Sequence, residues 1–366
     1  MEIKLSDLQV KNAALEKQRM SNRLVFLDDL KGLCILLVVF CHFVLLPADS
    51  VAGNIIMSIC WVAVPCFIMT TGYLLHKKET FDWKRYFTRL VTTYIVFVVW
   101  RLIYMCVQSN IYDETHTVSE YIRATLFAAD INGVDFGALW YMKAYIVIYL
   151  IYPVTWFLFR HDGRKFALGM LIVSFIGDIG VGAVNILLSY FGSFDISSVS
   201  TLVPYTNCAF MLTYFLIGAF MHEYRDDIKN KINRYIPVIL FVVGVLLIVL
   251  EKYIETKTMS WNNIYLNNGY KRISVMLASI GLFMCFNYYS SNKENVFGKY
   301  VGQCTMGVYY IHYILLILCV KYIYPYINIE NYSLAANLIK TVVMTAVCMV
   351  ITCIVRRIPL LKKMVM

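Results

Sequence analysis

The sequence predicts an all-α integral membrane protein with about ten transmembrane helices, and two observations support this class. Of the 366 residues, 60% are hydrophobic and only 15% are charged, whereas soluble domains average about 25% charged residues. Long apolar segments recur along the whole chain, with Lys and Arg residues in short clusters between them. Although the net charge is +10, this distribution is typical of loops that set membrane topology and argues against nucleic acid as a partner.

A helix needs about 20 apolar residues to cross a bilayer, and ten segments come close to this length. Two are less regular, because glycines and Asp178 interrupt 166–190 and because 203–221 is short. Residues 117–130 alternate polar and apolar faces, so we expect an extracytoplasmic amphipathic helix there, along the membrane surface. The ten predicted spans are 26–46, 54–75, 88–108, 138–159, 166–190, 203–221, 235–251, 272–290, 301–325 and 334–355.

The loops between these spans alternate in charge. If the N-terminus is cytoplasmic, most Lys and Arg residues fall in the loops on that side, and the alternation stays in phase to the last span. Cytoplasmic loops are enriched in these residues. We therefore predict two cytoplasmic termini: a tail over residues 1–25, then one transmembrane domain over 26–366 that ends in a short basic tail.

The first predicted span contains the sequence LDDLKGLCILLVVFCH, from Leu27 to His42. Lys31 and His42 are eleven positions apart, which places them within ~20° of one helix face and ~16 Å apart along the axis. Asp28 precedes Lys31 by three positions, a spacing that allows an ion pair within the helix. Such a polar stripe should face other helices or a water-filled cavity rather than lipid.

Further ionisable residues lie in or near other spans. Arg85 and Arg89 share one face at the cytoplasmic mouth of the third span, where they can clamp a phosphorylated ligand or simply set topology. Arg101 and Lys143 lie deeper beside aromatic residues, where they can line the same cavity or extend outward as anchors. For His312, a packing hydrogen bond is the simpler expectation. The eleven cysteines form no CxxC pair, so we expect neither a disulfide framework nor a metal site.

Six segments in sequence order resemble the motifs of one known family. They are the Lys31-x10-His42 pair, VPCFIMTTGYLL (64–75), KRYFTRLVTTYIVFVVW (84–100), LWYMKAYIVIYLIYPV (139–154), TYFLIGAFM (213–221) and VGQCTMGVYYIHYIL (301–315). Together they resemble acyltransferase family 3, membrane proteins that O-acylate bacterial cell-envelope glycans and related acceptors. The resemblance extends from Arg23 to the C-terminus. Lys31 stands where arginine is commonest in the family, and Thr71 and Thr305 stand where serine is expected.

This resemblance implies an O-acetyltransferase of the bacterial cytoplasmic membrane, with acyl-CoA as donor and no metal. The acceptor would be a hydroxyl of an envelope polysaccharide, a glycolipid or a lipid-linked saccharide, and the protein can form homo-oligomers. His42 would be the base or the nucleophile. Asp28 belongs with His42 to the implied catalytic set. The residues implied for the donor are Lys31, Arg85, Arg89 and Lys143, and those implied for the acceptor are Tyr73, Trp140, Tyr141 and Arg101.

Two other functions stay open at this point. A similar membrane domain precedes a soluble catalytic domain in some serine racemase resistance proteins, where it is thought to import an amino acid, so a transporter is one alternative. A non-catalytic assembly subunit, whose polar stripe only packs helices, is the other. Some relatives also carry a soluble esterase-like domain that completes transfer outside. Because none is evident here, this chain or a separate protein is expected to complete it.

Overall fold

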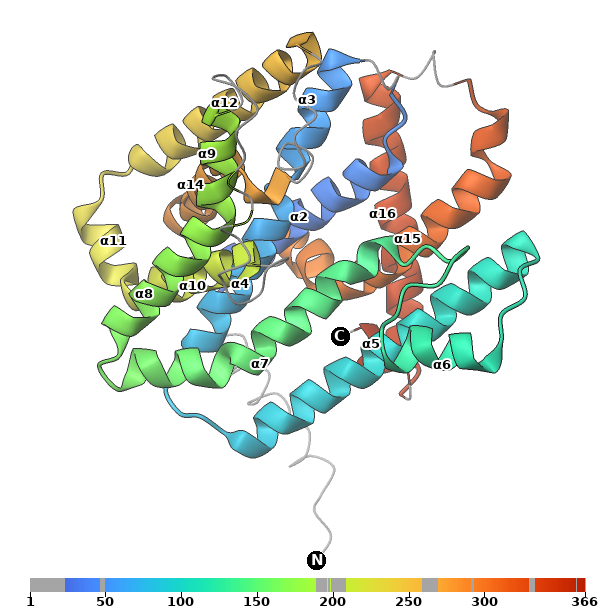
Figure 1. Ribbon diagram of the computed structural model, residues 1–366, viewed down its shortest axis with the longest axis horizontal. Helices are drawn as coiled ribbons and strands as arrows, with labels where there is room; N and C mark the ends of the chain where they lie inside the picture. Colours follow the sequence, from blue (N-terminus) through green and yellow to red (C-terminus); the bar gives the residue numbers. More distant parts are fainter. Residues whose placement is uncertain are drawn as a thin grey trace, which may run out of the picture.

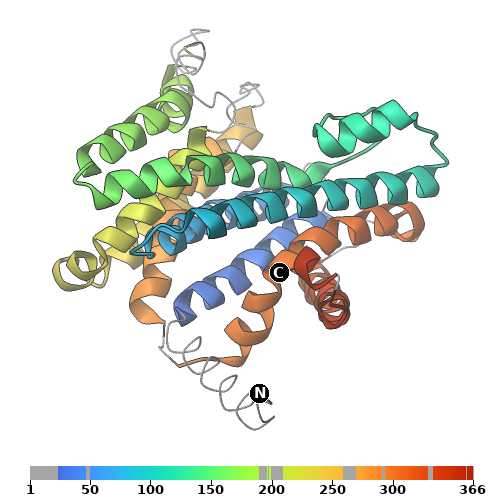
Figure 2. The ribbon, with the colours of Figure 1, turned by 90° about the horizontal axis from the view of Figure 1, so that it is seen from below.

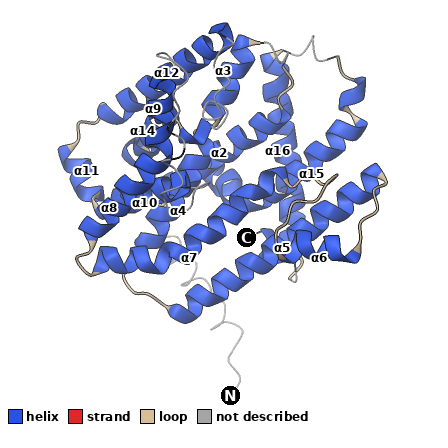
Figure 3. Ribbon diagram, in the orientation of Figure 1, coloured by secondary structure: helices blue, strands red, loops and turns tan. Residues whose placement is uncertain are grey.

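The computed structural model describes residues 24–46, 50–188, 196, 198, 209–258, 269–290, 293–328, 333–359 and 361–365 (Figure 1). Most of the predicted N-terminal tail, residues 1–23, lies outside this part of the chain. All regular secondary structure within it is helical (Figure 3). The predicted all-α class is therefore confirmed.

The helices follow one another in a single bundle. Viewed from below, α5 and α7 run side by side across the molecule (Figure 2). The elements are α2 (Val25–Phe43), α3 (Val51–Cys60), α4 (Ala63–His76), α5 (Trp83–Tyr112), α6 (Val118–Leu126), η1 (Gly137–Leu139), α7 (Trp140–Arg160), α8 (Arg164–Phe175), the π-turn η2 (Ile176–Gly180), α9 (Val181–Leu188), α10 (Ala209–Glu223), α11 (Arg225–Lys231), α12 (Ile236–Thr258), η4 (Gly269–Lys271), α14 (Ile273–Tyr289), the π-turn η5 (Gly298–Gly302), α15 (Gln303–Tyr322), η6 (Tyr324–Tyr326), α16 (Leu334–Arg357) and η8 (Lys362–Val365).

Within the described residues, each predicted span coincides with a helix or with consecutive helices, and residues 203–208 of the span 203–221 lie outside them. The span 54–75 corresponds to α3 and α4, and the irregular span 166–190 to α8, η2 and α9. Within the described residues, seven helical stretches are long and apolar enough to cross a membrane, and α10 and α14 are shorter apolar helices. The protein is an all-α membrane protein, whereas ten spans and two cytoplasmic termini stay predictions.

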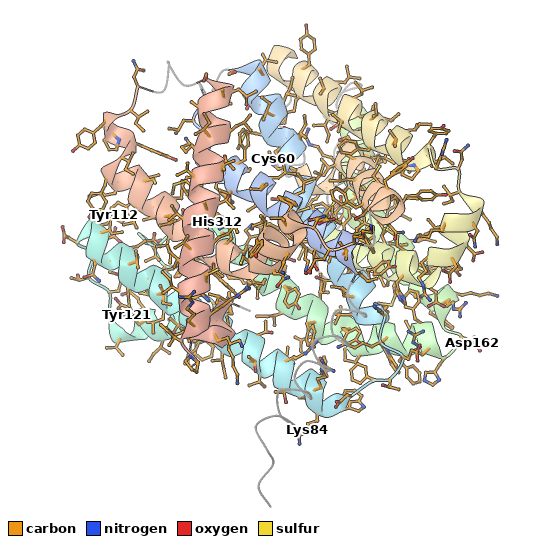
Figure 4. The ribbon with its side chains drawn as sticks, turned by 180° about the vertical axis from the view of Figure 1, so that it is seen from behind. Cys60, Lys84, Tyr112, Tyr121, Asp162 and His312 are labelled. Carbon is orange, nitrogen blue, oxygen red and sulfur yellow. The ribbon has the colours of Figure 1, made fainter. Side chains whose placement is uncertain are left out.

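Several helix ends that are predicted to share one side of the membrane lie near one another. In Figure 4, Lys84 and Asp162, from loops predicted to be cytoplasmic, lie toward the lower and right edges of the molecule. Tyr112 and Tyr121, from the loop predicted to be outside, lie at the left edge. The ends of α2, α4, α7 and α10, all predicted to be cytoplasmic, meet around one pocket of about 470 Å³.

Helices α4 and α10 touch backbone to backbone. A Cβ on Gly72 would lie 2.0 Å from the carbonyl oxygen of Phe215, and a Cβ on Gly218 would lie 2.1 Å from that of Met69. Small residues at such positions let membrane helices approach closely. This contact fixes α4, whose other face lines the cavity described below.

The amphipathic helix expected near 117–130 is present as α6. Thr117 caps its first turn, and the Glu120 side chain bonds back to the Thr117 backbone N–H at 2.7 Å. This hydrogen bond lowers the pKa of Glu120, because it stabilises the carboxylate. A capping box of this kind defines where α6 begins.

Candidate active site

A cavity of about 570 Å³ lies among α2, α4, α5, α7 and α15. Its volume falls within the range of about 300–1,000 Å³ that is typical of small-molecule sites. Lys31 and Asp28 from α2 lie in its wall, together with Thr71 and Thr305. The two threonines that replace serine in the family-like segments therefore both face the cavity.

A smaller chamber of about 70 Å³ adjoins this cavity and contains His42. The two hollows share part of their walls, so they are adjacent; the shared residues are Phe67, Tyr141, Thr305 and Met306. Lys31 lines only the larger part and His42 only the smaller part. The polar stripe of α2 thus faces a cavity, as its spacing predicts.

At the end that holds Lys31, α2 packs against the π-turn η5. The Nζ of Lys31 lies 2.8 Å from Oδ1 of Asp28, so the intrahelical ion pair forms. The backbone oxygen of Asp28 would lie 2.1 Å from a Cβ on Gly302, which explains why glycine is needed there. Asn295 donates to both carboxylate oxygens of Asp29, at 2.8 and 2.9 Å. Asp29 thereby fixes η5, and π-turns often occur at functional sites.

At the other end, His42 lies beside two residues of α15. The centroid of its ring is 5.2 Å from that of His312 and 5.4 Å from that of Tyr313, which it meets edge to face. The Tyr313 hydroxyl donates to Oδ2 of Asp135, whose Oδ1 accepts the Gly137 N–H at 2.6 Å. Within the described chain, the His42 ring has no hydrogen-bond partner. Both ring nitrogens are thus available to a ligand.

His312 lies near the centre of the molecule (Figure 4) and is fully buried. Its Nδ1 donates to the carbonyl oxygen of Val308 at 3.1 Å, within the same helix. Among the described residues its Nε2 has no partner. This bond lies within α15, so it is not the helix-packing hydrogen bond that was expected, and the ring instead contacts that of His42.

The Asp135–Tyr313 pair was not singled out from the sequence. The two residues are 178 positions apart, and no local pattern predicts that they meet. The only available signals were weak: Asp135 belongs to an acidic loop and Tyr313 follows His312 directly.

Tyr313 is expected to position His42, because its ring contacts the imidazole and its hydroxyl is held by Asp135. In Tyr313→Phe the aromatic contact stays but the hydrogen bond is lost, so kcat should fall about tenfold while the KM for the donor changes little. The pH profile of kcat should shift, which a merely structural role would not cause. The matched control is Tyr322→Phe on the exposed face of α15, and equal pH profiles for the wild type and Tyr313→Phe would contradict the assignment.

Neither Arg85 nor Arg89 is among the residues that line the large cavity. Arg85 lines a neighbouring pocket of about 290 Å³ together with Lys78 and Tyr149. Arg89 hydrogen bonds Tyr149 and lies one turn before Thr92, which lines the large cavity. Partial burial, with the charges of Arg89 and Arg85, lowers the pKa of Lys78 to about 8. Crowded cations of this kind favour an anionic ligand.

Lys143 is not part of this cluster of cations. Its Nζ pairs with Oδ1 of Asp130 at 3.2 Å, and it lines neither chamber. Asp130 follows α6 and lies 3.8 Å from the NH2 group of Arg101, which is more than four helical turns along α5 from Arg85. The geometry therefore gives no support to the predicted contact between Lys143 and the donor.

The predicted acceptor residues are dispersed. Tyr141 lines both chambers. Tyr73 is buried and lines the separate 470 Å³ pocket, where it meets His222 edge to face at 5.0 Å. Trp140 packs on Tyr270, with ring centroids 5.4 Å apart. Only Tyr141 lies where a ligand in the cavity would touch it.

Arg101 anchors α6 instead of lining the cavity. Its side chain is 0% exposed, and its Nε and NH2 groups donate to the carbonyl oxygens of Ala124 and Ala129. Its guanidinium also stacks 3.6 Å from the centroid of Phe136. A buried cation with these partners holds the outer loop against α5.

Arg101→Ala is therefore expected to lower the free energy of unfolding by ~2–4 kcal/mol, because buried carbonyl oxygens lose a charged donor. Thermal unfolding in detergent measures this loss. Arg123→Ala, on the exposed face of α6, serves as the control and should unfold like the wild type. A stable Arg101→Ala protein with a raised KM for the acceptor would instead favour the predicted substrate contact.

The fold and the cavity define a multi-pass membrane protein with a cavity among its helices. The family model described as an acyltransferase domain, Acyl_transf_3, matches residues 24–357. The chain belongs to this acyltransferase family, and the resemblance found in the sequence is confirmed. It is thus a membrane acyltransferase. Searches of curated proteins and of solved structures gave no significant match.

Proposed function

We propose that this protein transfers an acetyl group from cytoplasmic acetyl-CoA to a hydroxyl of a cell-envelope polysaccharide or glycolipid, in the bacterial cytoplasmic membrane. One observation carries the proposal: the cavity lined by the Lys31–Asp28 pair adjoins the chamber lined by His42, whose ring has no hydrogen-bond partner in the described chain. A cation at one end suits phosphate, and a free imidazole at the other suits acyl transfer.

The donor would bind with its phosphates near Lys31 and Arg89, with Arg85 and Lys78 beyond them. Its pantetheine arm would follow the hollow toward His42. Eleven residues of helix correspond to ~16 Å, and an extended arm of this kind bridges such a distance. The thioester would then lie beside the imidazole.

The acceptor would approach from the opposite side. A pocket of about 360 Å³ there is lined by Gln108, Glu114, Asp135 and Tyr313. Polar side chains of this type bind hydroxyl groups by hydrogen bonds. Because Tyr313 also contacts the His42 ring, a hydroxyl in this pocket would be close to the reacting centre.

Two routes use the same imidazole. In the direct route, His42 takes the proton of the acceptor hydroxyl while its oxygen attacks the thioester carbon. The C–O bond forms, the C–S bond breaks, and the imidazolium returns the proton to the CoA thiolate. In the two-step route, a ring nitrogen attacks the thioester carbon, the C–S bond breaks, and the ring proton passes to the CoA thiolate. The acceptor hydroxyl then takes the acetyl group from acyl-histidine, and its proton returns to the ring. The Asp135 carboxylate attracts the positively charged ring formed in either route.

Purified protein in proteoliposomes tests the proposal. With labelled acetyl-CoA and an envelope glycolipid extract, we expect release of free CoA and transfer of label to the extract. A transporter would move a solute without consuming thioester, and an assembly subunit would do neither. Intact acetyl-CoA in the presence of folded protein and acceptor extract would refute the proposal.

A further inference from the structure

The segment after α16 folds back onto the bundle instead of forming a free basic tail. Residues 362–365 form η8, which packs beside α15 and α16, and the side chain of Val365 is 0% exposed. Figure 1 shows this dark red turn near the centre of the view. The segment lies beyond residues 24–357, which the family match covers, so the family does not account for it.

Trp100 of α5 provides the first anchor. Its Nε1 donates to the carbonyl oxygen of Met364 at 2.9 Å. The same indole stacks on Tyr310 with ring centroids 4.9 Å apart, and Tyr310 lines the large cavity. The segment is thereby joined to the wall of that cavity.

Arg356 provides the second anchor. Its NH2 group donates to the carbonyl oxygen of Val365 at 3.2 Å and to that of Gln303 at 2.5 Å. Gln303 also lines the large cavity. Two independent contacts therefore hold residues 361–365 at the same place.

This arrangement brings a second lysine to the cavity. Lys363 lines it together with Lys31. Asp28, the carboxylate in the same wall, already pairs with Lys31 at 2.8 Å. Lys363 has no carboxylate partner among the described residues, so it adds positive charge that the wall does not neutralise.

We propose that Lys363 binds the phosphate groups of the acyl-CoA donor, and that segment 361–365 exists to hold it at the cavity. This inference rests on the proposed function. Lys31 makes only a point contact where arginine would offer a two-pronged one. A second ammonium group supplies the missing contact, because phosphates accept several charge-assisted hydrogen bonds at once.

A comparison of two donors tests this role. Lys363→Ala should raise the KM for acetyl-CoA about five- to tenfold, and leave unchanged the KM for acetyl-pantetheine, which lacks the nucleotide phosphates. Lys363→Arg should retain the wild-type KM. Lys362→Ala removes a neighbouring exposed charge that does not line the cavity, and it should behave as the wild type.

A second variant tests the segment itself. Val365→Asp places a charge at a buried position and should release the segment, with the same rise in KM for acetyl-CoA. Combined with Lys363→Ala it should add nothing further, since both changes remove one interaction. An unchanged KM for acetyl-CoA in Lys363→Ala would overturn the proposal. An equal rise in the KM values for acetyl-CoA and acetyl-pantetheine would also overturn it. So would a lower KM for acetyl-CoA, which would mean that the segment obstructs donor binding.

Direct binding separates this proposal from the proposed function. Adenosine 3′,5′-bisphosphate, which carries nucleotide phosphates but no thioester, should raise the melting temperature of the wild type and not that of Lys363→Ala. Equal stabilisation of both proteins would overturn the role of Lys363 even if acetyl transfer occurs. A protein that binds this nucleotide through Lys363 but never consumes acetyl-CoA would instead refute only the enzymatic proposal.

Discussion

His42→Ala is expected to lower kcat for acetyl transfer by about 10²–10⁴-fold, the usual contribution of a positioned base or nucleophile. The KM for acetyl-CoA should change little, because Lys31, which is proposed to bind the donor phosphates, lines the larger cavity and not the chamber of His42. Initial rates of CoA release in proteoliposomes measure both constants. Since the His42 ring has no hydrogen-bond partner in the described chain, its loss should not unfold the protein.

His161→Ala is the matched control for this variant. His161 lies in an exposed turn after α7 and stacks on Phe157 at 4.1 Å, away from both chambers. Its replacement should leave kcat at the wild-type value. If folded His42→Ala acetylates the acceptor at the wild-type rate, His42 is neither the base nor the nucleophile.

The same variant separates the two routes. If His42 is the nucleophile, wild-type protein incubated with labelled acetyl-CoA and no acceptor should retain label on the chain, and His42→Ala should not. If His42 is the base, neither protein should retain label, although the wild type still transfers acetyl to acceptor. Label on His42→Ala would point to a different nucleophile.

The positions of the helices could be predicted from the sequence, because a helix that crosses a bilayer needs a minimum length and an apolar composition. The sequence also predicted that Lys31 and His42 share one face, since helix geometry fixes the relation between positions eleven apart. The interruption at residues 176–180 was visible as glycines and Asp178. The sequence did not predict that these residues form a π-turn. It also did not predict that Oδ1 of Asp178 pairs with Nζ of Lys271 at 2.8 Å.

Contacts between distant segments were beyond the sequence for a physical reason: nothing local specifies which helices pack together. Arg101 shows the consequence. Its position beside aromatic residues was equally consistent with a residue that lines a cavity. Only the fold reveals that its Nε and NH2 groups donate to the backbone carbonyl oxygens of Ala124 and Ala129. The same holds for Lys363, which in sequence is one of several basic residues after the last span.

Lys31→Ala is expected to raise the KM for acetyl-CoA by about 10- to 100-fold, because a hydrogen bond to a charged group contributes ~1.5–3 kcal/mol. The value of kcat should change little once the donor is saturating, since Lys31 is not in the chamber that holds His42. Lys31→Arg should match or lower the wild-type KM, because guanidinium binds phosphate with two parallel bonds. Measurements at fixed low ionic strength keep the charge interaction unscreened.

Asp28 complicates this experiment and can be used to sharpen it. Lys31→Ala takes the lysine partner from a carboxylate that is only 8% exposed, so part of any defect could come from lost stability. The double variant Asp28→Asn/Lys31→Ala removes that charge as well. It should recover the melting temperature but keep the raised KM if Lys31 binds phosphate. Lys165→Ala, at an exposed position of α8, controls for the general loss of one cytoplasmic charge. A double variant with the wild-type KM would mean that the Lys31–Asp28 pair serves the packing of α2 against η5 and not the donor.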